Sequence, residues 1–231
     1  MSAATNPPVE RRTSVGRIFD HLYDEIVSLR LKPGDKLSEA DIAASFGVSR
    51  QPARDAFGRL ANLDLVVVRP QRATVVKRFS LREVEKSRFV RAAVEAEVLR
   101  RASARCDKVD AATLEREIDR QEAALATADF ARFAVLDYEF HEALCRIAGV
   151  DYAAEVIAAQ KAKVDRLCML GLSKEDRMPL LLADHRAMAD AVVRGDAEGA
   201  VERGMEHLSR LDATISTIRE TNANYFEPDD G

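Results

Sequence analysis

The hydrophobic residues of this chain change their spacing once, and that change limits the folds open to it. The first apolar stripe repeats at intervals of four, four and three residues, which is the period of a helix. Its members are Ile18, Leu22, Ile26 and Leu29. Two short runs rich in β-branched residues, at 65–68 and 74–76, then match a two-strand hairpin. Every later segment returns to helical spacing, so the chain is predicted to be mainly α, with a domain boundary near residues 78–80.

Three helices are expected ahead of the hairpin. The first, over 17–31, should stop at Pro33 and Gly34, because proline cannot continue a helix and glycine permits a turn. A short second helix over about 38–46 is followed by a third, over 49–62, which carries a proline in its first turn, where proline is tolerated. Three helices followed by a two-strand wing make a winged helix-turn-helix.

Four segments then account for the whole chain. The polar stretch 1–12, which contains two prolines, is expected to be a disordered arm. The winged helix-turn-helix occupies 13–78, and an all-α antiparallel bundle of six or seven helices occupies 81–222. A polar, flexible tail is expected over 223–231. The bundle helices are expected near 81–106, 110–126, 129–148, 151–171, 175–194 and 196–222.

Charge is distributed unevenly between the two domains. The net charge of the chain is −4. Residues 1–78 carry 13 Lys and Arg against 9 Asp and Glu, whereas the remainder carries 22 against 30. A basic front and an acidic back favour contact of the front alone with a polyanion. Since no apolar run approaches a membrane span and no signal peptide is visible, we expect a cytoplasmic protein with no membrane partner.

The third helix has the chemistry of a DNA recognition helix. A recognition helix must present polar and cationic groups at its N-terminal end, because that end enters the major groove. Arginine can read guanine through two hydrogen bonds, glutamine can read adenine, and serine can bind a phosphate. An ordinary three-helix unit with a solvated face would carry similar residues, so both interpretations remain open at this point. The candidate DNA-contacting residues are Ser49, Arg50, Gln51 and Arg54.

A dense motif runs through this region. The stretch LKPGDKLSEADIAASFGVSRQPARDAFGRL is followed by LDLVVVRPQRATVV. Together they resemble the winged helix-turn-helix of the GntR family, over about residues 15–78. The resemblance implies that the residues at the start of the third helix lie at DNA, with the wing touching the minor groove or the backbone. Family positions are matched by Glu39, Gly47, Val48, Ser49, Arg50, Pro52, Arg54 and Leu60.

The wing departs from the family pattern at two positions. Asp64 stands where a glycine usually precedes the first wing strand, and Ala73 stands where a glycine is usual at the wing tip. A glycine there would permit close approach of the backbone to DNA. Its loss shifts the expected wing contacts to the side chains of Arg69 and Arg72.

Three of the four histidines lie in the helical domain. Asp137 precedes His141 by four residues, so both side chains leave one helix in the same direction. With His185 and His207 they form a plausible ligand set for zinc, nickel, manganese or iron. Spacing alone does not prove that they converge, because an i, i+4 carboxylate and histidine is often a surface pair.

The sequence around these residues adds to the argument. The motifs are DYEFHEAL from Asp137, DHRAMADAVVRGD from Asp184, and MEHL from Met205. They resemble, in order, motifs of the FCD ligand-binding domain found in the FadR-type branch of GntR regulators, over roughly 81–222. The resemblance implies one divalent metal ion inside the bundle, with zinc as the first choice. The implied ligands are Asp137, His141, His185 and His207.

Arg91 is the candidate contact for an effector. Residues 91–95 match the R-x-x-L-E motif of the same family. An inward arginine near a metal suits a carboxylate ligand, because the metal takes one oxygen and the guanidinium pairs with the other. The alternative is an i, i+4 surface pair with Glu95. Arg88 lies on the same face and is a weaker candidate, and Asp151 stands where the family often has an asparagine.

These features favour a DNA-binding transcriptional regulator, in the form of a repressor, over an enzyme. A homodimer would place two recognition helices on a palindromic double-stranded operator, and a small organic or sugar acid bound at the metal would shift the spacing of the two heads. A metal-dependent enzyme acting on a small carboxylate is the alternative, but no motif supplies a general base. A third interpretation makes the metal purely structural.

Overall fold

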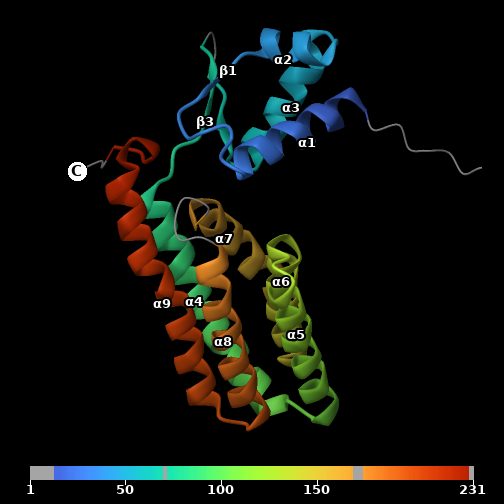
Figure 1. Cartoon of the computed structure of the whole chain (residues 1–231), viewed down its shortest axis with the longest axis vertical. Helices are drawn as coiled ribbons and strands as arrows, with labels where there is room; N and C mark the ends of the chain where they lie inside the picture. Colours follow the sequence, from blue (N-terminus) through green and yellow to red (C-terminus); the bar gives the residue numbers. More distant parts are fainter. Residues whose placement is uncertain (1–12, 70–71, 169–173, 229–231) are drawn as a thin grey trace, which may run out of the picture. The chain divides into compact units, whose positions relative to one another are not determined.

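The computed structural model describes residues 13–69, 72–168 and 174–228 (Figure 1). These residues divide into two compact units. One contains the residues up to Phe79 together with those from Asn224 onward, and the other contains Ser80–Ala223. The arm expected over 1–12 lies outside the described residues.

Three helices form the first unit, α1 (Ser14–Val27), α2 (Glu39–Phe46) and α3 (Arg50–Asn62). The Thr13 hydroxyl accepts a hydrogen bond from the Gly16 amide and begins α1. The helix ends four residues before the expected position, because Leu29 adopts a φ of 60°, in the left-handed region. Ile18, Leu22 and Ile26 of the apolar stripe are buried and pack with residues of α3, whereas Leu29 lies beyond the end of the helix and is only partly buried.

The turn between α2 and α3 sets where α3 begins. Ser38 caps α2 by accepting from the amide of Asp41. Gly47 ends the helix with a φ of 64°, a conformation that a residue with a Cβ rarely adopts. The chain then enters α3 at Ser49, whose side chain makes no capping hydrogen bond among the described residues.

A small antiparallel sheet completes the first unit. Strands β2 (Val66–Val67) and β3 (Thr74–Val76) form the expected hairpin. A further strand, β1 (Lys36–Leu37), pairs with the other edge of β3 and gives the order β1-β3-β2. Strand β1 was not predicted from the sequence, because two residues are too few to show the alternating pattern of a strand.

The second unit consists of antiparallel helices, as predicted. In Figure 1, α4 runs beside α9, while α5 and α6 lie side by side, and these pairs are in contact. A capping box between Asp107 and Asp110 begins α5. Gly149 and Gly195, with φ of 70° and 71°, follow α6 and α8. The helices are α4 (Leu81–Arg105), α5 (Lys108–Ala126), α6 (Phe130–Ile147), α7 (Tyr152–Cys168), α8 (Lys174–Val193) and α9 (Ala197–Thr221).

The segment expected to be a flexible tail is tied to the first unit over its described part. After α9, a 3₁₀ turn, η1 (Ala223–Tyr225), leads to Phe226. The Phe79 amide donates to the Tyr225 carbonyl at 2.9 Å, and the Glu227 amide donates to the Phe79 carbonyl at 2.8 Å. The Phe79 and Phe226 rings lie 5.7 Å apart, and both are buried. The polar composition of the segment led to the expectation of flexibility, although the segment also contains two aromatic residues, Tyr225 and Phe226.

The helices of both units fall short of what a bilayer requires. Among the described residues, no helix is long and apolar enough to cross a membrane.

Candidate functional site

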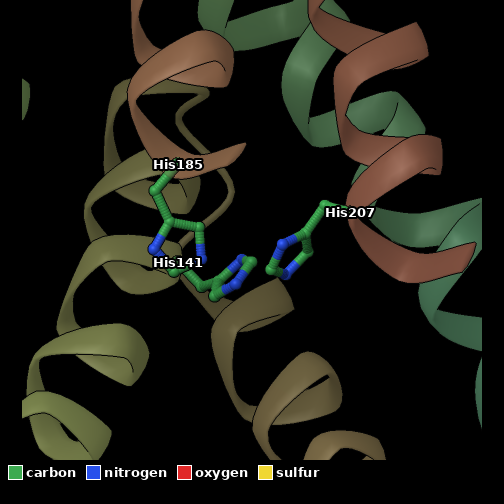
Figure 2. Close-up of side chains that lie close together, drawn as sticks. All are labelled: His141, His185 and His207. Carbon is green, nitrogen blue, oxygen red and sulfur yellow. The ribbon is translucent and has the colours of Figure 1, made fainter. Parts of the chain in front are cut away.

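The second unit brings its three histidines together. His141 comes from α6, His185 from α8 and His207 from α9, and Figure 2 shows their rings turned toward one another. One possible ligand atom from each lies within 4.8 Å of the others. All three are buried, His185 completely. Residues up to 66 positions apart in the chain thus converge, because α8 packs against both α6 and α9.

Asp137 is directed toward the same point from α6. Its Oδ1 lies 3.3 Å from His185 Nε2 and 4.0 Å from His141 Nε2. One carboxylate oxygen therefore faces two imidazole nitrogens. The four residues named from the sequence form one buried cluster of a carboxylate and three imidazoles.

An oxygen atom stands next to the Nδ1 of each histidine. Gln121 Oε1 lies 2.7 Å from His185 Nδ1. Glu95 Oε2 lies 3.6 Å from His141 Nδ1, and Asp184 Oδ2 lies 3.5 Å from His207 Nδ1. Of these contacts, the one from Gln121 has hydrogen-bond geometry, and as an acceptor it favours the His185 tautomer that carries its proton on Nδ1, which leaves the Nε2 lone pair available to a metal.

The electrostatics keep His141, His185 and Asp137 in the protonation states that bind metals. Burial, assisted by nearby cationic groups, holds the pKa of His141 and of His185 well below the ordinary value, although Asp137 opposes the shift. Burial also disfavours the charged form of Asp137, but Lys161 and the histidines outweigh it, so the pKa of this carboxyl is strongly lowered. Neutral imidazoles and an ionised carboxylate are the forms that bind metals.

Several buried polar atoms at this site lack a hydrogen-bond partner. Leaving such atoms unsatisfied costs free energy, so each needs an explanation. A bound cation would satisfy the imidazole nitrogens, and an anionic ligand would satisfy the guanidinium. The residues present therefore fit a divalent metal and an acid. The atoms are Arg91 Nη2, Glu95 Oε2, His141 Nε2, His185 Nε2 and His207 Nδ1.

Arg91 is paired with Glu95, but the pair is not on the surface. Arg91 Nε donates to Glu95 Oε1 at 2.7 Å, and the two side chains are only 4% and 3% exposed. The alternative considered from the sequence, an i, i+4 pair, is thus present inside the bundle and beside His141. Because Nη2 stays unpartnered, the pairing and an effector contact are compatible. Arg88 lies one turn earlier on α4 and is only partly buried.

Two residues at the centre were missed by sequence reasoning. Gln121 comes from α5, and its contact with His185 joins residues 64 positions apart, which no local pattern reveals. Lys161 on α7 places its Nζ 2.6 Å from Asp137 Oδ2. Its i, i+4 relation to Asp165 is visible in the sequence but is the same as that of a common surface ion pair.

The recognition helix holds the other candidate site. Arg54 forms a two-pronged ion pair with Glu39 of α2, with Nε at 3.1 Å and Nη2 at 2.9 Å from the two carboxylate oxygens. Gln51 Nε2 donates to Asp55 Oδ1 at 2.8 Å. Arg50 is exposed at the first position of the helix, next to Ser49. The four predicted residues share one exposed end of α3, with Arg54 and Gln51 each tied to a carboxylate.

The wing arginines lie beside a lysine from β1. Arg69 and Arg72 are both exposed and line a shallow hollow with Lys36, while the tip residues between them, 70–71, lie outside the described residues. Lys36 pairs with Val75 in the sheet, so the strand that the sequence analysis missed adds a cation to the wing.

Comparison with known proteins agrees with this arrangement. The family model for bacterial regulatory proteins of the gntR family matches residues 15–76, and the FCD domain model matches residues 88–210. A winged helix-turn-helix followed by a helical domain with a buried polar centre defines a DNA-binding transcriptional regulator. The chain belongs to the GntR family, in the FadR-type branch that carries an FCD domain, and its relatives are regulators and not enzymes.

Relatives match over nearly their whole length. The HTH-type transcriptional repressor RspR of Escherichia coli K12 is 34% identical over 211 residues, covering 91% of this chain and 92% of its own. The uncharacterized regulator YdfH of Escherichia coli O6:H1 is 34% identical over 221 residues, covering 95% and 94%.

Solved structures show the same fold. A GntR transcriptional regulator from Rhodococcus sp. RHA1 is 23% identical with a TM-score of 0.66, covering 88% of this chain and 97% of its own. McbR/YncC of Escherichia coli is 17% identical with a TM-score of 0.63, covering 89% and 98%. At these identities the likeness shows the fold alone.

Proposed function

We propose that this regulator is a metal-containing repressor that releases its operator when a small carboxylate binds in the helical domain. One observation carries the proposal: three buried histidines and an ionised aspartate converge beside an arginine whose Nη2 has no hydrogen-bond partner among the described residues. Such a centre needs both a cation and an anion to satisfy its polar atoms. The metal ligands are Asp137, His141, His185 and His207.

Zinc is the first choice of metal. Three imidazole nitrogens and one carboxylate oxygen suit zinc, and they also suit nickel, manganese and iron. When bound, the metal would hold one oxygen of an acid. The protein's own contribution is to orient His185 through Gln121 and to keep the centre buried.

The effector is an organic or sugar acid. Arg91 can pair with a carboxylate through its unpartnered Nη2 while Glu95 holds its Nε. An acid bound between Arg91 on α4 and the histidines on α6, α8 and α9 touches four helices at once. A ligand that binds one arrangement of these helices better than another shifts the population toward that arrangement.

A homodimer is the assembly that we propose. Apolar side chains are exposed on α4 and α7, which pack against each other: Phe89 is 76% exposed, Tyr152 74% and Val156 41%. Exposed apolar groups on adjacent helices mark an interaction surface. A two-fold dimer through this surface would present two copies of α3 to a palindromic operator in the cytoplasm.

Repression, as the sign of regulation, is supported by the relative RspR, which is named a repressor. The DNA contacts would come from α3 and the wing. The contacting residues are Ser49, Arg50, Gln51, Arg54, Arg69 and Arg72.

Elemental analysis and thermal shift test the metal and the effector together. Protein purified without added metal, and protein soaked in zinc and then desalted, should contain about one equivalent of metal per chain. Organic and sugar acids should raise the melting temperature of the loaded protein and not of chelated protein. His185→Ala should lose both effects and stay largely helical, whereas His21→Ala, at the histidine outside the cluster, should retain both.

Three outcomes separate the alternatives. Absence of metal after soaking removes the metal site from the proposal. If metal binds and chelation unfolds the domain while no acid gives a shift, the metal is structural. Duplexes selected from random DNA should be bound by loaded protein and released by the active acid, and retention of the duplex would contradict induction.

A further inference from the structure

Lys161 is a buried cation at the metal centre that the proposed function does not use. It lies on α7 with its side chain 10% exposed. Its Nζ is 2.6 Å from Asp137 Oδ2 on α6 and 2.5 Å from Asp165 Oδ2 on its own helix. The ammonium also lies 4.3 Å from the ring centroid of Tyr138, whose hydroxyl donates to Asp165.

The two carboxylate oxygens of Asp137 face different partners. Oδ2 accepts from Lys161, while Oδ1 faces His185 and His141. The ammonium lies between the carboxylates of Asp137 and Asp165, close enough to form an ion pair with each. The carboxylate expected to bind the metal is therefore already neutralised on one side by a fixed positive charge.

We propose that Lys161 is an internal cation that competes with the metal for Asp137, limits the metal affinity of the site and allows the bundle to fold without metal. This inference rests on the proposed metal centre. Lys161 holds one carboxylate oxygen and leaves a single oxygen for the metal. It is a positioning residue, because it acts through Asp137.

Charge repulsion gives the direction of the effect. A divalent ion at Asp137 Oδ1 would lie across one carboxylate from the ammonium, and like charges at such separation repel strongly in a buried site. Removal of the ammonium should therefore strengthen metal binding. It should also destabilise the metal-free protein, since the buried carboxylate of Asp137 would then lie near the partly exposed carboxylate of Asp165 with no cation between them.

A substitution at Asp165 is expected to change the metal affinity in the opposite direction. In the present arrangement Asp165 shares the ammonium with Asp137. Asp165→Asn removes that second anion and leaves Lys161 to pair with Asp137 alone. Competition against the metal should then increase, although the asparagine can still accept from Tyr138.

A simple structural role makes a different prediction. If Lys161 only fastened α7 to α6, both substitutions would lower the melting temperature, and neither would strengthen metal binding. Opposite changes in metal affinity for the two variants are expected only from competition for Asp137.

Zinc titration of the full-length chain against a chromophoric chelator tests the inference. Lys161→Met should bind zinc at least about tenfold more tightly than the parent protein, show a lower melting temperature without metal, and gain a larger shift from zinc. Asp165→Asn should bind zinc several-fold more weakly. Lys163→Met, at an exposed lysine of the same helix, should match the parent protein in all three measurements.

The results distinguish this inference from the proposed function. If the parent protein binds zinc and Lys161→Met binds it no more tightly, the inference is wrong and the metal centre stands. If Lys161→Met does not fold without metal, a zinc affinity of Asp165→Asn equal to or above that of the parent protein overturns the inference. If neither the parent protein nor Lys161→Met binds zinc, the metal centre itself is wrong.

Discussion

Gln121 Oε1 lies 2.7 Å from His185 Nδ1, and both side chains are completely buried. The Gln121 amide nitrogen donates to the Leu136 carbonyl at 3.4 Å, so its oxygen is the atom left to face the imidazole. As an acceptor, that oxygen places the proton of His185 on Nδ1 and the lone pair on Nε2. This nitrogen lies 3.3 Å from Asp137 Oδ1, at the centre of the histidine cluster.

Gln121→Leu should therefore weaken metal binding without removing a ligand. Loss of such an outer partner typically costs about 10- to 100-fold in metal affinity. Zinc affinity measured by chelator competition checks the effect. Gln160→Leu is the matched control, because Gln160 bonds to Ser87 and not to a histidine. Equal zinc affinity in the two variants would show that Gln121 does not orient the site.

The buried histidines also predict how the metal-free protein responds to acid. Burial holds the pKa of His141 and His185 below their unfolded value of 6.5, so below that pH the unfolded chain binds more protons than the folded one. Stability is therefore present above pH 6.5 and is lost as the pH falls below it. Each histidine contributes a slope of at most about 1.4 kcal/mol per pH unit.

Thermal melting of chelated protein between about pH 7.5 and 5.5 measures this slope. The pKa of Asp137 is lowered from a value of 3.8, so its contribution is lost only in stronger acid and does not enter this window. His185→Gln, which cannot titrate, should show a shallower dependence than the parent protein. A melting temperature that rises on acidification would contradict the assignment of neutral histidines.

The fold could be predicted from the sequence because its signals are local. The helical stripe of α1, the hairpin of β2 and β3 and the boundary after Phe79 are all read within short windows, and the mainly α fold class is confirmed. Strand β1 was not predicted, because two residues are too few to show the alternating pattern of a strand. The Phe79–Phe226 pairing was not predicted, because it joins positions far apart in the chain.

The residues of the candidate site also differ in whether a local sequence motif points to them. The histidines and Asp137 were named because their motifs resemble a family, whereas spacing alone left their convergence open. Gln121 and Lys161 belong to no such motif. Their roles depend on packing between helices, which brings α5 and α7 to the cluster.

The pairing of the C-terminal segment predicts a local loss of order in Phe226→Ala. The substitution removes a buried ring that packs on Phe79, and the free energy of opening at this pairing should fall by roughly 1–3 kcal/mol. Hydrogen exchange at the Phe79 amide, which donates to Tyr225, reports the change directly. Leu63→Ala, at a residue that is 52% exposed, should leave that protection intact. Unchanged protection in Phe226→Ala would show that the ring does not hold the segment.

The proposed dimer predicts that Phe89→Glu dissociates it. A carboxylate in the centre of an apolar interface must be desolvated, and two copies would meet near a two-fold axis. Sedimentation velocity should show a dimer for the parent protein and a monomer for the variant. Val109→Glu, at a residue that is 73% exposed on α5, is the control and should stay dimeric. Dissociation by the α5 variant and not by the α4 variant would place the interface elsewhere.

The ion pair between Glu39 and Arg54 predicts how the recognition helix reads DNA. The Glu39 carboxylate accepts hydrogen bonds from Nε and Nη2 of Arg54. This pair holds the guanidinium in a fixed orientation before the helix contacts DNA. The guanidinium in turn lowers the pKa of Glu39, so the carboxylate is ionised whenever DNA binds. Glu39→Gln should release Arg54 and remove a negative charge near the phosphates. Binding to random duplexes should therefore become tighter, whereas discrimination in favour of a selected site should fall.

Arg50→Ala and Arg54→Ala should lower both affinity and discrimination, each lost two-pronged base contact being worth about 1–3 kcal/mol. Titration of the selected duplex and a scrambled duplex at one salt concentration gives the ratio for every variant, since phosphate contacts depend on salt. Glu25→Gln, which breaks the pair between Glu25 of α1 and Arg30, controls for the loss of a charge. If Glu39→Gln keeps the full ratio while Arg54→Ala loses it, Arg54 reads DNA without help from Glu39. If neither arginine variant changes the ratio, α3 is not the helix that reads the site.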